Sequence, residues 1–182
     1  PPSPPSVPPC FATLSPFETL LNFTGATVGG WTNLGGLGPD HGSPRSILMP
    51  AVGTFNDQLI DLMVENLTQY VPKYTLNNRP SGGFGSINLN SPAEAGDADN
   101  AVQLKFSFLT HNTTDAVSLN KFRFSFFDFD EWTGGRGKEC MSLSTANVES
   151  YIVGDQTELV IETDEEQESM KFCSSQEGVV FD

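Results

Sequence analysis

The segment 126–132, with the sequence FFDFDEW, holds residues whose types and spacing suggest chemistry. Asp128 and Asp130 are two residues apart, so their side chains would lie on one face of an extended strand. If the alternation of phenylalanines along residues 122–126 continues, that face is the apolar one. Burying unpaired carboxylates costs several kcal/mol. The chain must therefore change register here or neutralise the two acids.

Two structures would solve this conflict. In the first, a β-bulge at Phe126/Phe127 shifts the register and turns the acids to solvent. In the second, the acids stay inward at the rim of a sheet and bind a hard cation, and carboxylate ligands of this kind suit calcium. The calcium ligands expected in that case are Asp128, Asp130, Asp61 and Glu131, with Asp57 as a further candidate.

An enzyme is the third interpretation of the same acids. Some glycoside hydrolases carry carboxylates at alternate positions of one strand, as nucleophile and general acid. Here Trp132 takes the next alternate position, and Glu139 lies beyond a glycine-rich turn, so the set is incomplete. The chain also contains no Gly-x-Ser-x-Gly motif and no phosphate-binding loop. We therefore expect no catalytic activity.

The two tryptophans indicate one further binding function. Trp31 and Trp132 both lie beside glycine-rich stretches, and an exposed indole is a good platform for a sugar ring. Together with the acids, they favour a calcium-dependent carbohydrate-binding module as the alternative function, with polysaccharide as its partner.

Sequons and cysteines indicate a secreted protein. The chain has three Asn-x-Thr acceptors for N-glycosylation, at Asn22, Asn66 and Asn112. Its three cysteines form no Cys-x-x-Cys pair, and the two histidines are far apart, so no zinc site is expected. We expect a disulfide between Cys140 and Cys173, which leaves Cys10 for a partner elsewhere.

Composition excludes several classes of partner. The 182 residues include 9 Lys and Arg against 23 Asp and Glu, a net charge of −14. Nucleic acids and anionic membranes are bound by clustered basic residues, which this chain lacks. No apolar run approaches the roughly 20 residues that span a bilayer, so no membrane insertion is expected.

Period-two alternation dominates the chain and predicts an all-β fold, an antiparallel β-sandwich of jelly-roll type over residues 11–182. Residues 1–10 are proline-rich and predict a polyproline II stalk. We expect a short helix over Ser15–Leu21 and a long surface loop over Gly29–Pro50. The apolar end of the chain suggests a truncated, longer protein. The predicted strands are Gln58–Leu67, Val102–Phe108, Phe122–Phe126, Phe84–Asn90, Glu139–Thr145, Ser150–Val153, Glu158–Thr163, Met170–Cys173 and Gly178–Phe181.

The Ser-Pro-Pro stalk that ends in Cys10 resembles the stalks of hydroxyproline-rich wall and extracellular-matrix glycoproteins of green algae, the pherophorin group among them. Segments 61–68, 84–89 and 124–130 resemble a secreted domain of microalgal and other protist surface proteins. The resemblance implies a structural role in a cell wall, matrix or surface filament, in contact with other subunits. It also implies hydroxylation and arabinose-type glycans at Pro2, Pro4, Pro5, Pro8 and Pro9.

Overall fold

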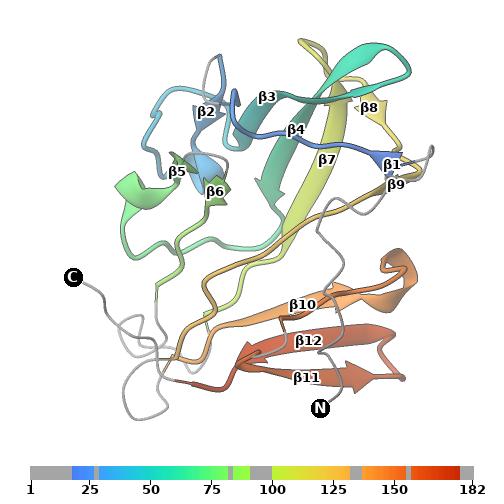
Figure 1. Cartoon of the computed structure of the whole chain (residues 1–182). Helices are drawn as coiled ribbons and strands as arrows, with labels where there is room; N and C mark the ends of the chain where they lie inside the picture. Colours follow the sequence, from blue (N-terminus) through green and yellow to red (C-terminus); the bar gives the residue numbers. More distant parts are fainter. Residues whose placement is uncertain are drawn as a thin grey trace, which may run out of the picture. The chain divides into compact units, whose positions relative to one another are not determined.

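The computed structural model describes residues 18–26, 29–81, 84–90, 100–131, 137–154 and 157–176. The chain forms two compact units. Unit 1 consists of Pro1–Asn90 and Asn100–Phe124, and unit 2 of Ser91–Asp99 and Ser125–Asp182. In the described parts of both units the regular structure is β-sheets and short 3₁₀ turns (Figure 1), and the two larger sheets are antiparallel, so the all-β prediction is confirmed. The jelly-roll topology and the single domain over 11–182 stay predictions, and the stalk lies outside the described residues.

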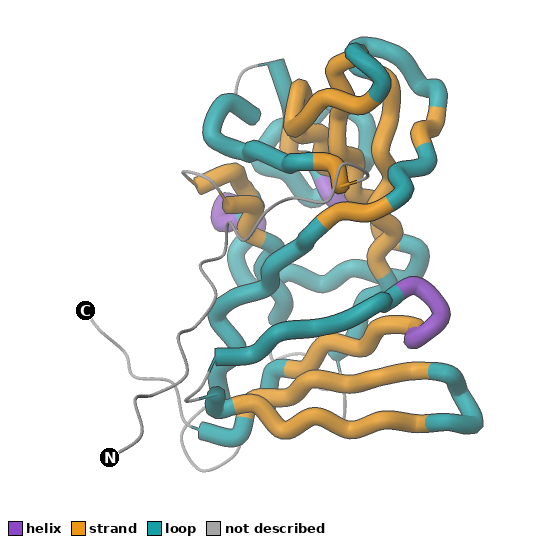
Figure 2. Tube along the Cα trace, turned by 45° about the vertical axis from the view of Figure 1, so that its right-hand side comes forward, coloured by secondary structure: helices purple, strands orange, loops and turns teal. Residues whose placement is uncertain are grey.

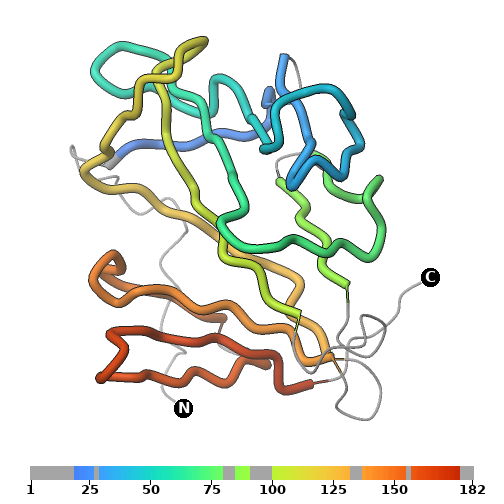
Figure 3. Tube along the Cα trace, turned by 180° about the vertical axis from the view of Figure 1, so that it is seen from behind, coloured from blue at the N-terminus to red at the C-terminus, as the bar shows by residue number. Residues whose placement is uncertain are grey.

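A five-stranded antiparallel sheet forms the body of unit 1. Figure 3 shows its long strands from behind. Ile60, Leu62 and Val64 alternate along one of these strands, and each is 1% exposed, so the predicted apolar face is confirmed. The strand order is β2 (Trp31–Thr32), β3 (Ile47–Phe55), β4 (Gln58–Asn66), β7 (Leu104–Thr110) and β8 (Ala116–Val117).

A tight turn fixes the register of the β3–β4 hairpin. Asn56 and Asp57 have φ values of 49° and 59°, and Phe55 pairs with Gln58. Two consecutive residues of positive φ form the turn whose twist matches a hairpin, and Asn and Asp tolerate that conformation. A slip of one residue would turn the apolar face of β4 outward.

The prediction of Gly29–Pro50 as a surface loop is wrong at both ends of the segment, whereas its middle, residues 37–45, is irregular and mostly exposed. The segment contains β2, the 3₁₀ turn η1 (Leu34–Gly36) and the start of β3. Leu34 is fully buried. Pro50 concealed the strand in the sequence, because proline removes a ladder donor. The structure accommodates it with a register shift between Met49 and Gly53.

Smaller elements complete unit 1. The parallel pair β1 and β9 shows that the predicted helix over Ser15–Leu21 is wrong in its described part, and that the predicted strand Phe122–Phe126 is regular only at its start. The predicted strand at Phe84 is confirmed but shorter. These elements are β1 (Glu18–Thr19), β9 (Lys121–Phe122), β5 (Arg79–Ser81), β6 (Phe84–Ser86) and the 3₁₀ turn η2 (Thr75–Asn77).

Unit 2 holds a three-stranded antiparallel sheet in the order β10-β12-β11 (Figure 2). Its strands confirm three of the predicted ones, whereas Ser150–Val153 is not a strand. The predicted strand Gly178–Phe181 lies outside the described residues. The elements are β10 (Cys140–Ser144), the 3₁₀ turn η3 (Thr145–Asn147), β11 (Leu159–Asp164) and β12 (Ser169–Ser174).

The predicted disulfide is confirmed and crosses this sheet. Cys140 and Cys173 are direct register partners on β10 and β12, with Cα atoms 4.1 Å apart. Met141 and Phe172 form the next cross-strand pair, and the ring of Tyr151 packs edge-on against Phe172. The bond therefore closes the chain segment that contains β11.

Replacing both Cys140 and Cys173 by alanine should lower the free energy of unfolding of unit 2 by about 3–4 kcal/mol. The reason is that the bond closes a loop with a sequence separation of 33 residues. Denaturant titration of the oxidised protein and the double variant measures the effect. Cys10→Ala is the control and should leave the midpoint unchanged; equal midpoints for all three proteins would contradict the expectation.

Candidate functional site

The buried carboxylate of Asp61 is the centre of a polar cluster in unit 1. The residue is 2% exposed. Its Oδ1 accepts a hydrogen bond from the backbone N of Ala51 at 2.7 Å and lies 2.7 Å from Nδ1 of His111. Its Oδ2 accepts a hydrogen bond from the backbone N of Asn112 at 3.1 Å. Three donors therefore satisfy a carboxylate that burial alone would penalise.

These donors come from two irregular pieces of backbone. Ala51 lies in the register shift of β3 with φ 53°, and Asn112 lies in the turn after β7 with φ 60°. Asp61 projects from regular β4 between them. The cluster thus connects the strand irregularity on one side of β4 to the β7–β8 hairpin on the other. The sequence showed an acid that interrupts an apolar strand, and it gave no sign of these partners.

Asp61 and the three predicted calcium ligands of segment 126–132 belong to different units. Asp61 is in unit 1, whereas Asp128, Asp130 and Glu131 are in unit 2. Asp57 is exposed in the β3–β4 turn. Over the part of the chain that the structure describes, no three His, Cys, Asp or Glu side chains are arranged to hold a metal ion together.

Two acids of segment 126–132, Asp128 and Asp130, lie in solvent, and the third, Glu131, is half-buried. The backbone leaves the extended conformation at Asp128, where φ is 66°. Phe127 is 66% exposed, while Phe129 is half-buried. The alternation of residues 122–126 therefore ends before the acids, which do not enter an apolar core. The exposure of Asp128 and Asp130 is what the first expected solution gives, but the β-bulge it required, with Phe127 in the core, is not present: residues 123–130 form no regular strand and Phe127 is exposed.

Glu139 is hydrogen-bonded to Asp130, although the sequence analysis had separated it from the acids of segment 126–132. Its backbone N donates to the carbonyl oxygen of Asp130 at 3.1 Å, and the backbone N of Asp130 donates to Oε2 of Glu139 at 3.3 Å. Burial raises the pKa of Glu139, and the charges of Asp128 and Asp130 raise it further, whereas the hydrogen bond from Asp130 lowers it. The intervening glycine-rich stretch, a hairpin-like signal, could have indicated this return of the chain.

Ser174 fixes the place of this acidic group beside the three-stranded sheet. Its Oγ donates to the carbonyl oxygen of Asp130 at 2.8 Å, and it accepts from the backbone N of Glu139 at 3.2 Å. The residue is 1% exposed at the end of β12. Main-chain and hydroxyl hydrogen bonds of unit 2 therefore hold Asp130 and Glu139. These two residues and Asp128, whose charge acts on Glu139, are named here the acidic cluster.

Only one of the two predicted sugar platforms lies among the described residues. Trp31 is half-buried in β2, and its Nε1 donates to Oγ of Ser46 at 3.1 Å. Trp132 lies outside the described residues. Trp31 is therefore only partly accessible to a ligand.

The three sequon asparagines differ in exposure. Asn22 and Asn112 are exposed, and Asn112 lies at the tip of the β7–β8 hairpin. Asn66 is half-buried at the end of β4, and its Nδ2 donates to the carbonyl oxygen of Thr68 at 2.8 Å. A glycan at Asn66 would have to share that amide with an existing hydrogen bond.

Comparisons of the chain with protein-family models, curated proteins and solved structures find no match. Within the described ranges, no helix is long and apolar enough to cross a membrane.

Replacing Asp61 by alanine should reduce the free energy of unfolding by about 1–3 kcal/mol, because three part-buried hydrogen bonds lose their acceptor. Asp61→Asn, which keeps one acceptor oxygen, should cost less. Urea titration measures both values. Asp115→Ala, which removes an exposed acid near the same hairpin, should stay within about 0.5 kcal/mol of the parent protein. A similar effect of Asp61→Ala and Asp115→Ala would contradict the role of the cluster.

Proposed function

We propose that this chain is a non-enzymatic structural glycoprotein of an extracellular matrix, cell wall or surface filament, where it assembles with other subunits. The observation that carries the proposal is that two sequon asparagines, Asn22 and Asn112, are exposed on a disulfide-bonded all-β scaffold. Exposed acceptors allow N-linked glycans to be carried without loss of the fold. The proline-rich residues 1–10 would add the stalk and its hydroxyproline glycans.

The disulfide supports an extracellular location. Bonds of this kind persist in oxidising compartments and are rare in the cytosol. The Cys140–Cys173 bond joins central β12 to β10 in a sheet of only three strands, which by itself offers a small core. A covalent tie of this sort is what small extracellular folds commonly use to remain folded.

Surface features of unit 2 support assembly. Tyr151 and Ile152 are consecutive and exposed, and Ile152 is 88% exposed. Contact between Tyr151 and Phe172 holds this pair against the sheet. The outer strands β10 and β11 also present backbone groups that can pair with another chain. Exposed apolar side chains are suited to contact between subunits.

Native protein should sediment as a self-associated species at micromolar concentration, and Ile152→Glu should lower its association constant about tenfold, since the charge replaces apolar contact area. Ser150→Glu is the matched control, because it adds the same charge to an exposed neighbouring position without removing apolar area. Analytical ultracentrifugation measures both. A strictly monomeric parent protein would overturn the proposed assembly.

A second candidate function is a calcium-dependent carbohydrate-binding module. The observation that favours it is the acidic cluster, in which the charges of Asp128 and Asp130 act on Glu139. A bound cation would relieve this repulsion, and oxygen ligands suit calcium. The exposed part of Trp31 would then serve a sugar ring.

For this candidate, millimolar calcium should raise the melting temperature, and a chelator should reverse the shift. The double variant Asp128→Asn/Asp130→Asn should lose the response, because it removes both fixed charges. Glu158→Gln, an exposed acid before β11, should keep it. Differential scanning calorimetry gives the shift and a glycan array gives the sugar. Absence of both effects in the parent protein would remove this candidate.

A further inference from the structure

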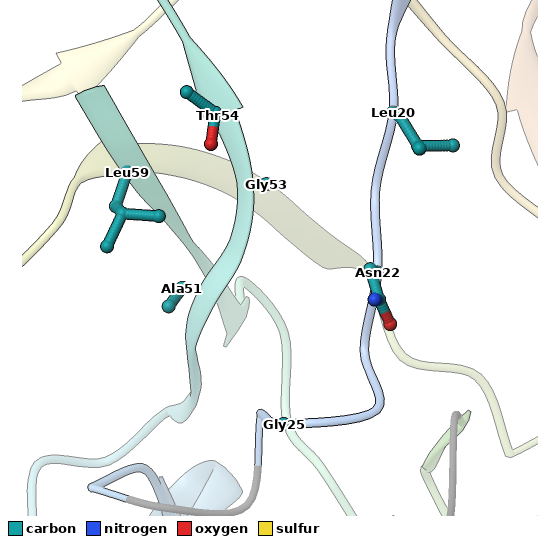
Figure 4. A pocket seen from close by; sticks show the side chains of 7 residues that line it. All are labelled: Leu20, Asn22, Gly25, Ala51, Gly53, Thr54 and Leu59. Carbon is teal, nitrogen blue, oxygen red and sulfur yellow. The ribbon is translucent and has the colours of Figure 1, made fainter. Parts of the chain in front are cut away.

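An open depression on unit 1 contains one of the sequon asparagines. Its volume is about 490 Å³, which falls within the range of small-molecule sites, roughly 300–1,000 Å³. Figure 4 shows that one wall comes from the segment after β1 and the other from β3 and β4. The lining residues are Leu20, Asn22, Gly25, Ala51, Gly53, Thr54 and Leu59.

The depression exposes apolar surface to water. Leu20 is 59% exposed and Leu59 is 47% exposed. Gly53 lies between them, and a Cβ there would come within 2.9 Å of the carbonyl oxygen of Leu20. The absence of a side chain at Gly53 therefore allows the two walls to approach. Thr54 adds a hydroxyl at the rim.

Asn22 is held in a defined position on this wall. Its backbone N donates to the carbonyl oxygen of Val52 at 2.6 Å, next to the antiparallel bridge between Leu21 and Gly53. Its side-chain Oδ1 accepts from the backbone N of Thr24 at 3.0 Å. This hydrogen bond orients the amide, while Nδ2 makes no hydrogen bond to the described part of the chain. Nδ2 is the atom to which an N-linked sugar is attached.

We propose that the first sugars of an N-linked glycan on Asn22 occupy this depression and cover Leu20 and Leu59. This inference depends on the proposed glycoprotein function and adds where the glycan lies. A pyranose ring has C–H faces that can pack on leucine side chains, and hydroxyl groups at its edge that can reach Thr54. The ring would remove apolar surface from water, which stabilises the folded state.

The covalent step requires an oligosaccharide linked to a lipid pyrophosphate. Nδ2 of Asn22 forms a bond to the anomeric carbon of the first sugar, and the bond from that carbon to the pyrophosphate oxygen breaks. The lipid pyrophosphate leaves with the electron pair. One amide proton passes to a base of the transferase.

Asn112 provides an internal comparison. It lies at the tip of the β7–β8 hairpin, is exposed, and does not line the depression. Its neighbours Thr113 and Asp115 are polar and exposed. A glycan at Asn112 would extend into solvent without covering the leucines.

The test uses the full chain secreted by a eukaryotic host, with Thr24→Ala and Thr114→Ala as matched variants. Each removes one sequon, keeps its asparagine, and leaves all lining residues of the depression intact. We expect Thr24→Ala to lower the melting temperature by about 3 °C and Thr114→Ala by less than about 1 °C. In the folded parent protein, peptide N-glycosidase should release the Asn112 glycan at least about tenfold faster than the Asn22 glycan, because the depression shields the sugar–asparagine bond at Asn22.

Leu59→Thr gives a second readout that leaves both sequons in place. It should speed release from Asn22 several-fold and leave release from Asn112 unchanged. Equal melting shifts and equal release rates at two occupied sites would overturn the inference and leave the glycoprotein function standing. Mass spectrometry that finds no glycan at Asn22, Asn66 or Asn112 would overturn both.

Discussion

The buried carboxylate of Asp61 is the constraint on which unit 1 depends. Sheets are normally held by their ladders, but here β3 is interrupted by a register shift and the β7–β8 hairpin is joined by a turn of positive φ. One side chain of the central strand β4 supplies the acceptor that both irregular segments need. The cost of burying the charge is offset by these hydrogen bonds only while all of them are made. These hydrogen bonds therefore stabilise the observed register of β3, β4 and β7, and a shifted register would lose them.

Buried amide side chains also hydrogen-bond to backbone groups of the loops. Asn33 donates through Nδ2 to the carbonyl oxygen of Ser43 at 2.6 Å and accepts from the backbone N of Gly38 at 2.9 Å. Asn78, which is fully buried, donates to the hydroxyl of Tyr70 at 2.6 Å and accepts from the backbone N of Asn88 at 2.8 Å. Burial raises the pKa of Tyr70, so its hydroxyl stays a donor to Asn88 over a wider pH range. Side chains thus order stretches that strands do not.

Local patterns predicted the parts of the fold that local physics controls. Period-two alternation found β4, β7 and the strands of unit 2, and the two late cysteines were paired correctly. Strand β3 was missed over its whole length because Pro50 resembles a strand breaker, and only the pairing with β4 shows that a register shift accommodates it. The contacts of Asp61 were beyond prediction, since its partners are two backbone groups and a histidine whose positions depend on the folded chain. The glycine-rich stretch before Glu139 signals a return of the chain but not the hydrogen bonds with Asp130. Sequence therefore identified the unusual acids and could not tell which were buried.

The two edges of the unit 2 sheet differ in charge. Strand β11 ends in Glu162, Thr163 and Asp164 and leads into a turn with Glu165 and Glu166, whereas β10 has no charged residue. Parallel pairing of β11 with β11 of a second copy would place Glu162 opposite Glu162 and Asp164 opposite Asp164, so that symmetric pairing is disfavoured. Pairing β10 of one copy with β11 of the next avoids the repulsion and leaves a fresh edge at each end. Such a head-to-tail contact forms a ring only if the rotation between copies closes, and otherwise forms an open filament. A filament of this kind would be polar, with a free β10 edge at one end and a free β11 edge at the other.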